Sequence, residues 1–172
     1  MKLLHIWQPL KTEVWTPDKS DYNWITEDIA VGMQPRDNDA IEELIDDGIS
    51  NILCLHRVAL PYDPFKYNIG FEHIKIADGA LMPLECAKSG INFISDSLQK
   101  KEKVFVHCEM GVSRSPMMVV LYLITHQKMD FNTALSYVIE KRPSAHPFPN
   151  LVDLDLVINL LHYCYGIEND KE

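Results

Sequence analysis

Short apolar runs alternate with longer amphipathic stretches along most of the chain. The run ISNILCLH at residues 49–56 is continuous and of strand length, which is typical of a buried strand. The segment FEHIKIA at residues 71–77 alternates in polarity and predicts a second strand. Apolar residues at spacings of three and four predict a helix over residues 84–100. By the same reasoning we expect strands over residues 28–33 and 103–107, and helices over residues 37–47, 114–127, 130–141 and 150–164.

Residues that favour helix ends stand at the limits of these segments. Asp37 or Asn38 can cap the first helix, and Gly48 follows its end. Asn150 can cap the last helix. Strands that alternate with helices indicate an α/β fold whose sheet is covered by helices on both faces.

The chain length of 172 residues is that of a single domain. All three tryptophans lie within residues 1–24, which predicts an irregular Trp-rich arm that packs its aromatic side chains on the domain. With neither a repeat nor a linker in the sequence, we expect one domain over residues 25–168 and a polar tail at residues 169–172.

The composition narrows the functional class. A net charge of −9 argues against a general binder of nucleic acid or of anionic membranes. Four cysteines without a C-x-x-C spacing predict neither a disulfide scaffold nor a structural metal site. The longest apolar run, residues 116–124, is far shorter than the ~20 residues of a membrane span. We therefore expect a cytoplasmic protein with reduced thiols and with no membrane or nucleic-acid partner.

The segment HCEMGVSRS at residues 107–115 lies between a predicted strand and a predicted helix. Of the four cysteines, Cys108 alone has an arginine, Arg114, six residues later. A loop that enters a helix N-terminus presents unpaired N–H groups and a positive dipole end, which attract an anion. Gly111 permits the turn that points these amides inward, and Arg114 can hold two phosphate oxygens.

The same positive field acts on Cys108. It lowers the pKa of a thiol, so that the thiolate forms near neutral pH and can attack phosphorus. Ser115 can donate to that thiolate or help it leave in a second step. The reaction also needs an acid for the leaving oxygen, and Asp63, Asp78 and Asp96 are the candidates. Asp78 is preferred because it follows a predicted strand, and open α/β sheets bind ligands at the carboxyl ends of their strands.

HCEMGVSRS resembles the signature loop of the cysteine-dependent protein tyrosine phosphatases, in their small dual-specificity branch. The segments GISNILCLH, IKIADGALMPL and EKRPSAHPFPN resemble other parts of that branch, so the likeness covers roughly residues 25–165. It implies a central, mostly parallel sheet of about four to five strands and a two-step reaction through a cysteinyl-phosphate, with no metal and no cofactor.

The resemblance also implies roles for single residues. Cys108 would be the nucleophile, Arg114 the phosphate clamp, Asp78 the acid and then the base, and Ser115 an aid to hydrolysis of the intermediate. His107 would hold the loop through hydrogen bonds. The phosphate would lie on the loop itself, which adds Glu109, Met110, Gly111, Val112 and Ser113 as binding residues.

Two residues have a second interpretation. Asn150 matches a family position that supports the active-site loop, although a plain helix cap would look the same. Cys54 is placed like a cysteine that bonds to the oxidised nucleophile in lipid-phosphatase relatives, although a small core residue would also fit.

The substrate stays partly open. The chain lacks the long loop with which tyrosine-specific members deepen their pocket, so a phosphorylated protein or peptide carrying phosphotyrosine, phosphoserine or phosphothreonine is expected. The five residues between Cys108 and Arg114 include no base, and Glu109 should disfavour a highly phosphorylated head group. The alternatives are a phosphatase for a phosphoinositide, a nucleotide or a sugar phosphate, and a catalytically weak phosphate-binding module.

Overall fold

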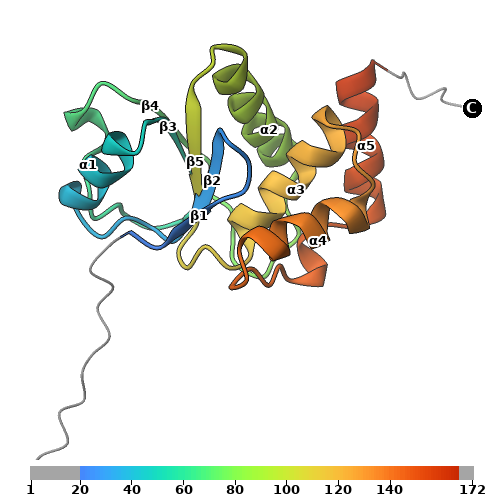
Figure 1. The fold of residues 1–172 in the computed structure, drawn as a ribbon. Coiled ribbons are helices and arrows are strands. Elements are labelled where there is room, and N and C mark those ends of the chain that lie inside the picture. Colours follow the sequence, from blue (N-terminus) through green and yellow to red (C-terminus); the bar gives the residue numbers. More distant parts are fainter. Residues whose placement is uncertain (1–19, 167–172) are drawn as a thin grey trace, which may run out of the picture.

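The computed structural model describes residues 20–166, which form a five-stranded sheet between two layers of helices (Figure 1). The strands are β1 (Tyr22–Trp24), β2 (Ile29–Gly32), β3 (Ile49–Cys54), β4 (Gly70–His73) and β5 (Lys103–His107). They lie in the order β1-β2-β5-β3-β4, and every neighbouring pair is parallel except β1 with β2. The α/β fold with a mostly parallel sheet is therefore confirmed.

Helix α1 (Asn38–Asp46) covers one face of the sheet. On the other face, α2 (Leu84–Gln99) and α3 (Arg114–His126) pack directly on the strands. Helix α4 (Phe131–Lys141) packs on α3, and α5 (Leu154–Tyr165) packs on α2 and α3 (Figure 1).

The central strand β5 contributes to two cores. Val104 and Val106 belong to the core shared with α2 and α3, whereas Phe105 belongs to the core beneath α1. Successive side chains of a strand point to opposite faces, so burial on both sides accounts for the continuous apolar run. Helix α3 is buried from Arg114 to Thr125, which fixes its N-terminus in the middle of the domain.

The prediction of a strand over residues 71–77 is wrong for residues 74–77, which lie beyond the end of β4. Strand β4 ends at His73 because its neighbour β3 ends at Cys54, and the Ile74 N–H makes the last hydrogen bond to the Cys54 carbonyl at 2.9 Å. The Ile76 carbonyl instead accepts a hydrogen bond from Arg114 at 3.0 Å. Residues 74–77 thus leave the sheet and turn toward the loop that follows β5.

Two other expectations need correction. Residues 22–24, assigned to the arm, form an edge strand antiparallel to β2; residues 1–19, with Trp7 and Trp15, lie outside the described residues. The last helix is capped by Asp153, which accepts the Leu156 N–H at 2.8 Å, and not by Asn150. Within residues 20–166, no helix is both long and apolar enough to cross a membrane.

Candidate active site

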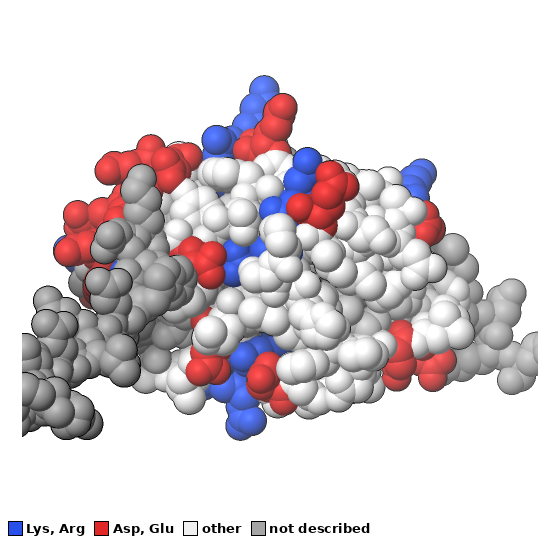
Figure 2. Space-filling model, turned by 60° about the horizontal axis from the view of Figure 1, so that its bottom comes forward, with Lys and Arg blue, Asp and Glu red and all other residues white. Residues whose placement is uncertain are grey.

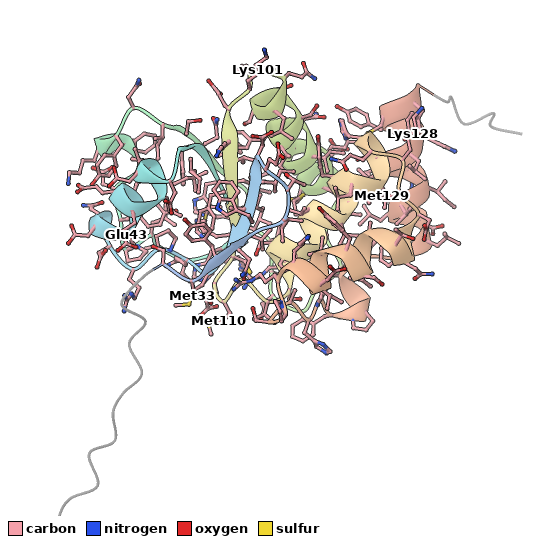
Figure 3. The ribbon with its side chains drawn as sticks, in the orientation of Figure 1. Met33, Glu43, Lys101, Met110, Lys128 and Met129 are labelled. Atoms are coloured by element: carbon pink, nitrogen blue, oxygen red, sulfur yellow. The ribbon has the colours of Figure 1, made fainter. Side chains whose placement is uncertain are left out.

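The loop at residues 108–113 joins the end of β5 to the start of α3. Cys108 is 2% exposed, and Arg114, the first residue of α3, is 3% exposed. Met33 and Met110 mark this end of the sheet at the bottom of Figure 3. The loop lies at a helix N-terminus, where N–H groups and the helix dipole favour an anion.

Gly111 is the residue that lets the loop close against β2. Its φ is +64°, and a Cβ there would lie 2.3 Å from the Gly32 carbonyl carbon and 2.7 Å from the Met33 nitrogen. Beside it, the Gln34 N–H donates to the Glu109 carbonyl at 3.0 Å. A side chain at position 111 would therefore push the loop away from the sheet.

Arg142, which the sequence analysis did not single out, holds the loop from the other side. Its side chain is fully buried, and its Nε donates to the Gly111 carbonyl at 2.7 Å. The remaining guanidinium nitrogens donate to Asp21 at 3.1 and 3.2 Å and to Asn23 at 2.8 Å. The arginine thereby ties the loop to the segment that begins the sheet.

The chain after α4 also contacts the loop. The His146 N–H donates to the Val112 carbonyl at 2.7 Å, and the Phe148 N–H donates to the Ser113 hydroxyl at 3.0 Å. Both loop atoms act as acceptors, so these contacts hold the Val112 carbonyl and the Ser113 hydroxyl against the chain after α4 and leave the loop N–H groups free of them.

The surroundings of Cys108 act on its pKa in opposite directions. Burial raises the pKa, but the Ser115 hydroxyl and N–H, the positive charge of Arg114 and the Gly111 N–H together lower it below the ordinary value. The Ser115 hydroxyl lies 3.4 Å from the Cys108 sulfur. These groups therefore stabilise the Cys108 thiolate more than water stabilises that of an ordinary cysteine.

Arg114 joins the loop to Asp78. Its Nη1 donates to the Ile76 carbonyl at 3.0 Å, which orients the guanidinium, and its Nε lies 3.1 Å from the Asp78 carboxylate. The Nε to Asp78 contact is an ion pair without hydrogen-bond geometry. The Asp78 side chain is 59% exposed, so it lies at the rim of the site with access to water.

The other two acid candidates lie elsewhere. The Asp63 carboxylate accepts the Phe65 N–H at 2.9 Å in a short turn after β3, and Asp96 is exposed within α2. Asn150 donates to the carbonyl of Gly79, so it contacts the loop that carries Asp78 and not the loop that carries Cys108.

A cavity of about 210 Å³ opens above the Cys108 sulfur. Among residues 20–166, no group of His, Cys, Asp and Glu side chains is arranged to hold a metal ion. The cavity combines a buried thiol, a guanidinium and a carboxylate with an apolar rim, and it is lined by Asp78, Cys108, Glu109, Met110, Val112, Ser113, Arg114 and Phe148.

Residues 84–157 match the family described as "Dual specificity phosphatase, catalytic domain". The chain is 37% identical over 124 residues to "MAP kinase phosphatase with leucine-rich repeats protein 3" of Dictyostelium discoideum, covering 71% of this chain and 14% of that protein. It is 34% identical over 113 residues to "Dual specificity protein phosphatase 1B" of Arabidopsis thaliana, covering 60% of this chain and 63% of that protein. The chain belongs to the dual-specificity phosphatases, a branch of the cysteine-dependent protein tyrosine phosphatases.

Solved structures agree with this dual-specificity phosphatase fold. The "Crystal Structure of PTPMT1 in complex with PI(5)P" superposes with a TM-score of 0.73 at 19% identity, covering 84% of this chain and 97% of that one. The matched family region contains the Cys108 loop but begins after Asp78. Among the first curated relatives, the chain spans between 14% and 63% of the relative's length.

His107 of this dual-specificity phosphatase is fully buried beneath the loop. Burial lowers its pKa to about 4, more than its hydrogen bond to Cys108 raises it. In the neutral ring Nδ1 donates to the Cys108 carbonyl at 3.0 Å, because a carbonyl can only accept. Nε2 therefore accepts the Tyr62 hydroxyl at 2.8 Å, and the chain of hydrogen bonds positions Cys108 from below.

Cys54 on β3 pairs in register with His107 on β5, and His107 is the residue that precedes Cys108. Cys54 and Cys108 are not bonded to each other, and burial raises the pKa of Cys54 to about 11. A disulfide between Cys54 and Cys108 stays a prediction, which peroxide treatment and disulfide mapping would test.

The charge around the site is mixed. Acidic side chains gather over α1 at the left of Figure 2, while the rest of that face has a broad uncharged area with scattered charges. Attraction of a phosphate therefore depends on the loop, the N-terminus of α3 and Arg114 more than on the charge of the surface.

Proposed function

We propose that this dual-specificity phosphatase hydrolyses phosphotyrosine, and also phosphoserine and phosphothreonine, in phosphorylated proteins or peptides. The observation that carries the proposal is the arrangement around Cys108. A sulfur with a lowered pKa lies 3.4 Å from the Ser115 hydroxyl, in the same cavity as Arg114 and Asp78.

In the first step, the Cys108 thiolate attacks phosphorus and the bond from phosphorus to the ester oxygen breaks. Loop N–H groups and Arg114 hold the phosphate oxygens, where negative charge develops in the transition state. Asp78 gives its proton to the leaving oxygen, so that an alcohol or phenol departs. Its position at the exposed rim suits this role because the leaving group must reach solvent.

In the second step, a water molecule attacks the phosphorus of the cysteinyl-phosphate. Asp78, now a carboxylate, accepts a proton from the water, and the sulfur leaves as the thiolate. The Ser115 hydroxyl donates to that sulfur and stabilises it as a leaving group. The products are inorganic phosphate and the enzyme in its starting form.

The rim of the cavity supports an aromatic phosphoester. Met110 is 58% exposed and Phe148 is 40% exposed, and both line the cavity together with Val112. These apolar side chains can cover the two faces of a phenyl ring while the phosphate lies on the loop. The smaller side chains of phosphoserine and phosphothreonine would leave part of this apolar surface in water, so we expect phosphotyrosine to be the better substrate.

A phosphoinositide is the second candidate, because the solved structure of PTPMT1 with TM-score 0.73 contains PI(5)P. The loop argues against it in this chain. The Glu109 carboxylate lies 3.3 Å from His56 and 3.9 Å from Arg114, so an acidic group stands where additional phosphates would approach. Repulsion there costs a polyphosphorylated ligand more than a peptide with one phosphate.

Turnover of an aryl phosphate in the presence of a metal chelator tests the proposal. We expect Cys108→Ser to abolish turnover, while Cys86→Ser, a matched change on α2, leaves it unchanged. Asp78→Asn should lower kcat with phenyl esters of high leaving-group pKa, and the exposed control Asp96→Asn should not. Full activity of Cys108→Ser would overturn the proposal, and a higher kcat/KM for PI(5)P than for a phosphotyrosine peptide would assign the second candidate.

A further inference from the structure

A second hollow, larger than the catalytic cavity, lies along the edge strand β4. It has a volume of about 840 Å³ and is formed by β4, the residues that follow it and residues 57–65, which lead into the short turn η1 (Pro64–Lys66). Figure 1 shows this loop between β3 and β4, at the α1 side of the sheet. We name the hollow the β4 groove; its wall includes Arg57, Val58, Phe65, Phe71, His73 and Lys75.

The β4 groove and the catalytic cavity are lined by residues that lie close together along the chain. Phe71, His73 and Lys75 are spaced by two residues and all line the groove, as residues on one side of an extended chain do. Lys75 is three residues from Asp78, which lines the catalytic cavity, so the two Cα atoms are at most ~11 Å apart. That distance is within the reach of an extended peptide of about four residues.

Two polar contacts of His56, one through its carbonyl and one through its side chain, connect the two hollows. His73 Nε2 donates to the His56 carbonyl at 2.6 Å, and the His56 side chain lies 3.3 Å from Glu109 of the catalytic loop. The buried His56 thus links His73 in the wall of the groove to Glu109 at the rim of the active site.

The groove exposes aromatic surface on a turn that is held by hydrogen bonds. Phe65 is 84% exposed, and its ring packs edge-on against the ring of Phe71, with 6.1 Å between the centroids. The centroid of the Phe71 ring lies 6.2 Å from that of the His73 ring. The turn is held by Asp63, whose carboxylate accepts the Phe65 N–H and whose own N–H donates to Asn38, each at 2.9 Å. Val58, which is 60% exposed, lines the same groove as Phe65, and neighbouring exposed apolar side chains mark binding surfaces.

The charge of the groove differs from that of the whole chain. Arg57 and Lys75 are exposed, and within residues 20–166 neither forms an ion pair. Asp63 lines the groove too, but its carboxylate is used to cap the turn. On a protein of net charge −9, these two cations favour an acidic ligand at this place.

We propose that the β4 groove binds the segment of the substrate protein that flanks the phosphorylated residue, and that it prefers a segment with acidic and large apolar side chains. The proposal rests on the phosphoprotein phosphatase function argued above. Phe65 and Phe71 would hold the apolar side chain, and Arg57 and Lys75 would pair with the acidic ones. A small aryl phosphate fills only the catalytic cavity and does not reach the groove.

Two phosphotyrosine peptides and an aryl phosphate test the groove. One peptide carries Asp, Glu and Leu on both sides of the phosphotyrosine, and the other carries Gly and Ser. We expect Phe65→Ala and Lys75→Gln each to lower kcat/KM for the first peptide about tenfold, the loss expected of a hot-spot residue. The aryl phosphate and the Gly/Ser peptide should change by less than about twofold, and only the effect of Lys75→Gln should fade in high salt.

Leu154→Ala and Lys128→Gln are matched controls. Leu154 is 72% exposed on α5, and Lys128 lies at the right of Figure 3, on the side opposite α1. Groove variants that match these controls on the first peptide, while the aryl phosphate is hydrolysed, would overturn the groove and leave the phosphatase function standing. Loss of aryl phosphate turnover in the unmodified protein would instead overturn the function itself. A Phe65-dependent preference for PI(5)P vesicles over both peptides would assign the groove to a lipid and also overturn the proposal.

Discussion

Arg142 gives the most specific prediction about how the active-site loop is held. Its side chain makes four hydrogen bonds, one to Gly111 and three to Asp21 and Asn23, and it is fully buried. Breaking a buried ion pair by removing one partner costs about 3–5 kcal/mol. Asp21 is 38% exposed and can regain water, so we expect Arg142→Met to lose about 3 kcal/mol, near the lower limit of that range.

The loss is large beside the ~5–15 kcal/mol by which most domains are stable. With a typical urea m-value of about 2 kcal/mol/M, the unfolding midpoint should fall by roughly 1.5 M. Arg142→Lys keeps the charge but not the planar fork, so we expect about half of that loss. kcat for an aryl phosphate should fall in both variants at urea concentrations where they stay folded, because the Gly111 carbonyl is released.

Urea unfolding followed by fluorescence, with the neighbouring exposed Lys141→Met as control, measures these effects. The control should stay within about 0.5 kcal/mol of the unmodified protein. If Arg142→Met and Lys141→Met unfold at the same midpoint, the buried guanidinium of Arg142 does not stabilise the domain.

Three further changes address the loop itself. Gly111→Ala places a Cβ 2.3 Å from the Gly32 carbonyl carbon at a φ of +64°, so the loop must move and kcat should fall about a hundredfold. Ser115→Ala removes a donor to the Cys108 sulfur, so the pKa of Cys108 should rise and the acidic limb of kcat/KM should move to higher pH, as measured by a pH–rate profile and by the pH dependence of iodoacetamide alkylation. The pKa of His107 is about 4 when folded against 6.5 when unfolded, so between these values the unfolded chain binds more protons. Stability should therefore fall by up to about 3 kcal/mol as the pH drops from 6.5 to 4, and His107→Gln should flatten this dependence in urea unfolding.

For each of these three variants, one result would contradict the prediction. Wild-type kcat in Gly111→Ala would show that the loop tolerates a side chain against β2. An unmoved acidic limb in Ser115→Ala would mean that the hydroxyl does not set the pKa of Cys108. An equal loss of stability on acidification in His107→Gln would assign that loss to other groups.

The central strands were predictable because their residues are buried on both faces. Residues 49–54 and 103–107 form β3 and β5 where continuous apolar runs indicate them. The end of β4 was not predictable, since the alternation of FEHIKIA continues past the point where its partner strand stops. Strand β1 has three residues and lies in a Trp-rich stretch whose pattern indicates no strand.

The residues of the candidate site also divide into those that the local sequence predicts and those that only the fold reveals. Cys108 and Arg114 could be singled out because their spacing and their place between strand and helix are local features of the sequence. Arg142 could not, because most arginines are solvated and its carboxylate partner Asp21 is 121 residues away in the chain. The contact of Arg114 with Asp78 likewise depends on two segments that only the fold brings together.

In the proposed reaction the phosphate passes through Cys108 before it reaches water. Ser115→Ala slows departure of the sulfur, so the intermediate should accumulate when this variant is mixed with excess aryl phosphate and quenched in acid within one turnover. We expect a phosphate on Cys108 in the peptide that mass spectrometry recovers from the quenched protein. Release of phosphate at the same rate with no adduct on Cys108, or an adduct on another residue, would contradict it.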